Sequence, residues 1–222
     1  MNQIVPAFLV ESKKEFTDKI KLVEQDAKLI QLDVLNGSMF SNTTWWDPDG
    51  VSAIQTSLEI ELHLMVENPI PIVEEFQRKV PGFAQAIVHA EIDRQTGAVV
   101  AYIKDILGLK AGVALNPETP LEAIEEVLHT IDQLTIMGVH PGSSGQTFGD
   151  NEHIGSKEAI LNKIRQARRH RSDLIIEVDG GVTDELIPEL IKAGANRICA
   201  ASLIFKNENP TSKLQMLNDS IL

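Results

Sequence analysis

The sequence lacks several features that would place a protein outside the ordinary globular enzymes. Only one cysteine, Cys199, occurs in 222 residues, so no disulfide can form within the chain. Its apolar surroundings predict a plain core residue. No apolar run is long enough to cross a bilayer, and the first residues lack the basic and then apolar order of a signal peptide. We therefore expect a cytoplasmic protein that does not associate with membranes.

Basic residues are also few. The chain has 20 Lys and Arg against 32 Asp and Glu, which gives a net charge of -12. Such an acidic surface disfavours binding to nucleic acid, and a small anionic ligand would need a local site that overcomes this field. No linker, low-complexity segment or short repeat divides the chain, so we predict one domain over residues 1–222.

What the sequence does have is a regular alternation of short apolar runs with longer segments of helical period. The runs are rich in Ile, Val and Leu, as in strands that are buried on both faces of a parallel sheet. Eight such units predict a (β/α)8 barrel, with a doubly wound open sheet as the alternative. The predicted strands cover residues 4–10, 28–35, 58–66, 84–92, 110–116, 133–139, 174–180 and 197–202.

The segments between the runs predict helices. Thr119 is the expected cap of a helix that begins at Pro120, a position where proline is tolerated. Pro188 lies just past the start of another helix, which it would kink or delay. The predicted helices cover residues 13–25, 120–131, 156–171, 183–194 and 209–222.

Polar residues interrupt several of the apolar runs. His63 alone would be interpreted as a hydrogen-bonded core histidine. Asp33 and Asp179 are harder to explain in that way, because buried aspartates are rare without a partner. In a barrel, the carboxyl ends of the strands meet at one mouth, so these three residues predict either a site for a divalent cation or a metal-free polar cluster.

Glycine-rich pieces follow the last three predicted strands. They are HPGSSGQTFG (140–149), DGG (179–181) and AAS (200–202). Barrels often bind phosphate through loops at these positions, although ordinary tight turns would have the same composition. The candidate ligand-binding residues in these loops are His140, Gly142, Ser143, Ser144, Gly145, Gly180, Gly181, Ala201 and Ser202.

Several longer motifs resemble the ribulose-phosphate 3-epimerase family in sequence and order. They are ELHLMVENP (61–69), GVALNPETP (112–120), IMGVHPGSSGQTF (136–148), EVDGG (177–181) and AASLIF (200–205). The likeness covers nearly the whole chain. It implies a barrel that acts on a phosphorylated ketose, with one aspartate on each face of the sugar exchanging the proton at C3.

The resemblance also implies a role for each matching residue. Asp33 and Asp179 are the expected acid and base, and together with His63 they are expected to bind a divalent ion such as zinc, iron, manganese or cobalt. Met65 and Met137 are expected to cover the flat intermediate. Barrels of this kind often form homo-oligomers.

This chain departs from the family pattern at several positions. Where the family has H-x-D-x-M-D-G, this chain has QLDVLNG (31–37), so Gln31 offers only a neutral amide oxygen where a metal-binding histidine is expected. Ala7 lacks the hydroxyl expected in the first strand. The phosphate loop reads PGSSGQ (141–146), and Ala201 stands where a glycine is expected, which tightens the backbone approach to phosphate.

Three functions therefore stay open at this point. The chain is a C3 epimerase of a phosphorylated ketose, a related barrel with aldolase or decarboxylase chemistry, or a sugar-phosphate-binding homologue with impaired catalysis in which the metal ion is weakly bound or absent. The loop that contains Trp45 and Trp46 is expected to expose both rings, either at an interface or over the mouth of the barrel.

Overall fold

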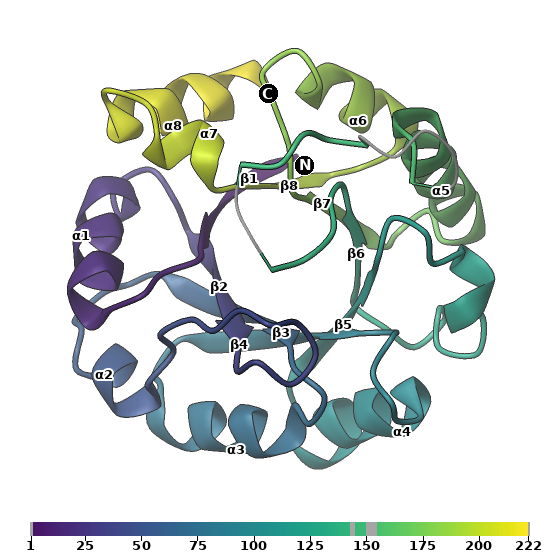
Figure 1. Ribbon diagram of the computed structural model, residues 1–222, viewed down its shortest axis with the longest axis horizontal. Helices are drawn as coiled ribbons and strands as arrows, with labels where there is room; N and C mark the ends of the chain where they lie inside the picture. The colour runs from purple at the N-terminus through teal and green to yellow at the C-terminus, as the bar shows by residue number, and fades with distance from the viewer. Residues whose placement is uncertain (1, 143–144, 150–154, 222) are drawn as a thin grey trace.

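The computed structural model describes residues 2–142, 145–149 and 155–221. Its strands pair in parallel in the order of the sequence and close into one barrel, with the helices on the outside (Figure 1). The predicted (β/α)8 barrel is confirmed, and the open sheet is excluded because β1 pairs with β8. The strands are β1 (Gln3–Phe8), β2 (Leu29–Leu35), β3 (Glu59–Met65), β4 (Phe83–His89), β5 (Lys110–Leu115), β6 (Gln133–Met137), β7 (Ile175–Asp179) and β8 (Arg197–Ala200).

The helices begin where the sequence supplies caps. Ser12, Ser156 and Asn209 each accept a hydrogen bond from a backbone N–H of the first turn that follows them. Among the described residues, no helix has the length and apolar character needed to cross a membrane. The helices are α1 (Lys13–Val23), α2 (Pro48–Ser52), α3 (Ile70–Lys79), α4 (Thr96–Ala101), the π-helix η1 (Tyr102–Ile106), the 3-10 helix η2 (Leu121–Ile124), α5 (Lys157–His170), α6 (Ile187–Ala193), α7 (Ser202–Phe205) and α8 (Pro210–Ser220).

Two helix predictions need correction. The segment 120–131 forms only the short helix η2 followed by turns, and Thr119 does not cap it. Leu121, Ile124 and Val127 recur every three residues, a spacing that suits the three residues per turn of a 3-10 helix. The helix predicted at 183–194 begins later, at Ile187, so the delay expected from Pro188 is confirmed.

The two tryptophans are less exposed than the sequence predicted. Trp45 and Trp46 are partly buried and pack against the hydrophobic core. The Trp45 ring lies 5.6 Å from the ring of Phe16 in α1, centroid to centroid. These rings therefore anchor their loop to the barrel wall, and neither lines the cavity that lies beside Asp33 and Asp179.

Alternation along the strands explains the polar residues inside apolar runs. Successive strand residues face opposite sides of the sheet. In β2, Ile30, Leu32 and Val34 join the core cluster between sheet and helices, whereas Gln31 and Asp33 face the barrel interior. Barrel interiors are more often filled by branched apolar side chains. Here many of the buried, inward-facing side chains are polar, and they include Gln31, Asp33, Glu61, His63, Gln85, His89, Gln133, Thr135, Glu177 and Asp179.

Candidate active site

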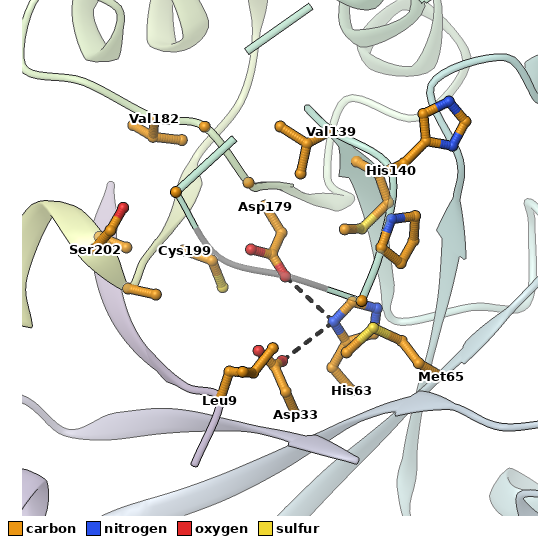
Figure 2. A pocket seen from close by; sticks show the side chains of 18 of the residues that line it. Leu9, Asp33, His63, Met65, Val139, His140, Asp179, Val182, Cys199 and Ser202 are labelled. Carbon is orange, nitrogen blue, oxygen red and sulfur yellow. Dashed lines mark ion pairs between the residues drawn. The ribbon is translucent and has the colours of Figure 1, made fainter. Parts of the chain in front are cut away.

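Three strands bring Asp33, His63 and Asp179 together near the carboxyl ends of the barrel strands. Asp33 in β2 is paired in register with His63 in β3, and Asp179 is the last residue of β7. Nδ1 of His63 lies 3.4 Å from Oδ1 of Asp33 and 3.2 Å from Oδ2 of Asp179. Figure 2 shows the two carboxylates approaching this ring nitrogen from different sides. All three side chains face one cavity.

Gln31 lies beneath this group and holds the two aspartates together. Its Nε2 donates to Oδ1 of Asp33 and to Oδ2 of Asp179, each at 2.8 Å. Its Oε1 accepts from Sγ of Cys199 at 3.1 Å. Gln31 is fully buried and does not line the cavity. The amide therefore cross-links two carboxylates that would otherwise repel each other.

The two aspartates differ in proton affinity. Burial is the main cause that raises the pKa of Asp33 above its ordinary value, and the Asp179 charge adds to it. Burial also acts to raise the pKa of Asp179, but hydrogen bonds from His63 and Gln31 hold it below its ordinary value. Burial disfavours a charged His63, yet both carboxylates outweigh it and raise the pKa of His63 to about 10.

The residues of this group are suited to a divalent metal ion. Asp33, His63 and Asp179 each offer one ligand atom, and these atoms lie within 4.8 Å of one another. Two carboxylate oxygens and an imidazole nitrogen are a mixed set that suits zinc, manganese or iron. Gln31 turns its N–H2 toward the carboxylates and its oxygen toward Cys199, so it would offer a ligand oxygen only after a half-turn of the amide.

The cavity above this group has about 590 Å³ of empty space. This volume includes solvent at the opening of the cavity. Ser143 and Ser144 lie outside the described residues, and Gln31 lies below the cavity. The other candidate residues all line it: Asp33, His63, Met65, Met137, His140, Gly142, Gly145, Asp179, Gly180, Gly181, Ala201 and Ser202.

The loops after β6, β7 and β8 form the outer end of the cavity. Gly181 has a φ of 69°, and a Cβ there would come within 2.6 Å of the Phe148 backbone nitrogen, so only glycine fits. Nε2 of His140 lies 2.5 Å from Oε1 of Glu118, so an acidic side chain stands beside this ring. Nζ of Lys206 lies 3.0 Å from the position that a Cβ atom would take at Gly145, so this lysine is close to the loop. The sequence alone did not point to Lys206.

A second polar layer supports the first from below. Arg197 donates to Glu61 at 3.0 Å, and Gln133 and Thr135 donate to Glu177 at 2.8 and 2.9 Å. Burial and the Glu177 charge raise the pKa of Glu61 well above its ordinary value. Glu61 and Glu177 also hydrogen-bond each other, which requires a proton on one of the two carboxyl groups. The other members of the cluster are fully buried, Arg197 is partly exposed, and none of them lines the cavity.

Cys199 has a larger role than the plain core residue that its surroundings predicted. It lines the cavity while its thiol donates to Gln31, which contacts both aspartates. Barrel closure brings β8 next to this layer, and nothing in the local sequence could show that contact.

Comparison with known proteins places these features in a family. Residues 3–205 match the model of the ribulose-phosphate 3 epimerase family. The chain belongs to this family. The ribulose-phosphate 3-epimerase of Bacillus subtilis (strain 168) is 36% identical over 218 residues, which cover 92% of this chain and 93% of that one. The ribulose-phosphate 3-epimerase of Chlamydia trachomatis serovar D is 35% identical over 196 residues, 87% of this chain and 82% of that one.

A solved structure agrees with the fold. The 3-hexulose-6-phosphate synthase of Salmonella typhimurium superposes with a TM-score of 0.71 at 13% identity, over 100% of this chain and 98% of that one. At that identity, the likeness bears on the fold alone. The family match confirms the resemblance that the sequence motifs indicated. It also confirms the predicted enzyme class, because the family consists of carbohydrate-phosphate epimerases.

Proposed function

We propose that this protein inverts C3 of a pentulose 5-phosphate and so interconverts D-ribulose 5-phosphate and D-xylulose 5-phosphate. The observation that carries the proposal is the placement of Asp33 and Asp179. They come from strands separated by β1 and β8 in the ring, and both line one cavity. Inversion at a carbon needs two groups of this kind, one for each face of the sugar.

The reaction balances with these two carboxyl groups alone. One carboxylate takes the proton from C3, next to the carbonyl, and the electron pair moves to the carbonyl oxygen. The other carboxyl, already protonated, delivers its proton to C3 from the opposite face. Each group ends in the protonation state that the other one had, and exchange with solvent or the reverse reaction resets the pair.

The negative charge that develops on the substrate oxygens needs a partner. A divalent ion held by Asp33, His63 and Asp179 would act there as a Lewis acid. Met65 and Met137 are each 3% exposed and line the same cavity, so they would offer apolar walls to a planar intermediate. Backbone N–H groups of the glycine loops, with Lys206 beside Gly145, would receive the phosphate.

A coupled assay tests the proposal. Protein treated with a chelator is mixed with D-ribulose 5-phosphate, and formation of D-xylulose 5-phosphate is followed with zinc, manganese, iron or cobalt added in turn. We expect turnover with at least one of these ions. Absence of turnover with all four, in protein that is folded, would contradict the proposal and leave the related chemistries or a binding role to be tested on other phosphosugars.

A further inference from the structure

A line of hydrogen bonds runs from His63 away from the cavity. Nε2 of His63 lies 2.9 Å from Nε2 of His89 in β4, and Nδ1 of His89 lies 3.0 Å from Oε2 of Glu91. Oε1 of Glu91 accepts the backbone N–H of Asn116 at 2.8 Å. Neither His89 nor Glu91 lines the cavity, so neither is placed to touch a substrate.

The two imidazole rings meet edge to edge. Their planes differ by 16° and their centroids are 5.0 Å apart, while the facing nitrogens are 2.9 Å apart. In this arrangement a proton on one nitrogen points at the in-plane lone pair of the other. Both rings are 0% exposed, so water does not offer another partner. One proton must therefore lie between the two nitrogens, since two facing lone pairs would repel.

The ionisation state of Glu91 determines which of the two rings carries that proton. Burial acts to raise the pKa of Glu91, but hydrogen bonds from His89, Thr119 and the Asn116 N–H hold it below its ordinary value. An ionised carboxylate can only accept, so Nδ1 of His89 is the donor. A neutral His89 then has its lone pair on Nε2, and the proton between the rings belongs to Nε2 of His63.

We propose that His89 and Glu91 are positioning residues that hold one proton of His63 on Nε2, so that the proton lost when a divalent metal ion binds is the one on Nδ1. The inference builds on the proposed function, in which Nδ1 of His63 is a ligand. Without this line of hydrogen bonds, the single proton of a neutral His63 would lie on Nδ1, because the carboxylates of Asp33 and Asp179 both face that atom. A proton there would bar the ion.

The test measures metal affinity and tautomer rather than turnover. Purified full-length protein is stripped of metal, and the affinity for cobalt(II) is measured by competition with a chromophoric chelator. We expect His89→Leu and Glu91→Gln to weaken cobalt binding about 10- to 100-fold, the range found when partners of metal-ligating histidines are lost. His89→Gln keeps an acceptor that can reach His63 and should recover part of the affinity.

A matched control is available nearby. Oε2 of Glu67 accepts the backbone N–H of Asp93 at 3.0 Å, much as Glu91 accepts that of Asn116, and no imidazole contact is recorded for it among the described residues. Glu67→Gln should leave cobalt affinity unchanged. Long-range ¹H–¹⁵N spectra of the zinc-loaded protein should show the His63 proton on Nε2 and the His89 proton on Nδ1.

Three outcomes would overturn the inference. They are unchanged cobalt affinity in His89→Leu and Glu91→Gln proteins that circular dichroism shows to be folded, a zinc-loaded His63 without a proton on Nε2, or a wild-type protein that binds no cobalt. A different result would contradict the proposed function. A protein that binds metal with the help of this line of hydrogen bonds but does not convert ribulose 5-phosphate would refute the epimerase and leave the role of His89 and Glu91 standing.

Discussion

The cross-link made by Gln31 leads to a prediction about stability. Gln31→Leu keeps nearly the same volume but removes both N–H donors from the buried carboxylates of Asp33 and Asp179. Hydrogen bonds to charged groups contribute about 1.5–3 kcal/mol each, so loss of the pair would cost about 3–6 kcal/mol. Protonation of one carboxyl relieves part of this loss. We expect the free energy of unfolding to fall by about 3 kcal/mol or more in the presence of a chelator.

The assay is urea unfolding at pH 7, with a chelator and again with saturating zinc or manganese. An ion between the aspartates would replace the lost donors, so the difference between Gln31→Leu and wild type should shrink when metal is present. Gln85→Leu is the matched control, because Gln85 is also a buried glutamine of the barrel interior but its Nε2 has no hydrogen-bond partner among the residues that the structure describes. Leucine there should change stability by less than about 1 kcal/mol.

Two results would refute this reasoning. Gln31→Leu could be as stable as wild type with the chelator present, or Gln85→Leu could lose as much stability as Gln31→Leu. Either result would mean that the amide cross-link does not hold the carboxylates together.

Two further predictions concern the charged groups of the site. Since the folded-state pKa of His63 is raised from 6.5 to about 10, its stabilising effect is complete below pH 6.5 and is lost as the pH rises through 10. The free energy of unfolding of metal-free protein is therefore measured in urea at several pH values, for wild type and for His63→Gln. The difference between the two should fall over this window by at most about 1.4 kcal/mol per pH unit. A difference that stays flat or rises with pH would contradict the raised pKa of His63. Lys206→Ala should raise the KM for the sugar phosphate about fivefold with little change in kcat, because Nζ of Lys206 lies beside the Gly145 loop. An unchanged KM in steady-state assays would show that Lys206 does not bind the phosphate.

The barrel was predictable because its strands repeat one simple signal. Each strand is a short apolar run bounded by helical segments, and this pattern does not depend on which strands become neighbours. Where the local signal was ambiguous, prediction failed. The segment that forms η2 has apolar residues every three positions, which a helical interpretation of residues 120–131 overlooked.

The group of Asp33, His63 and Asp179 was also visible in the sequence, because charged residues inside buried runs need partners. The hydrogen bonds of these residues could not be predicted from the sequence. Gln31 contacts Asp179 across 148 positions of the chain, and the contact between Cys199 and Gln31 spans 168. Contacts of this kind depend on the closure and register of the barrel, which no local pattern contains. For the same reason, the sequence does not show that His89 contacts His63 or that Glu91 contacts His89.

The most direct test of the account follows the proton at C3. D-ribulose 5-phosphate is converted in D2O, and the product is examined by NMR for deuterium at C3. Wild-type protein should place deuterium there, and Asp33→Asn and Asp179→Asn should each lower the rate of interconversion by about 10²-fold or more. Product without deuterium at C3, or normal turnover in either variant, would contradict the claim that these two carboxylates exchange the proton.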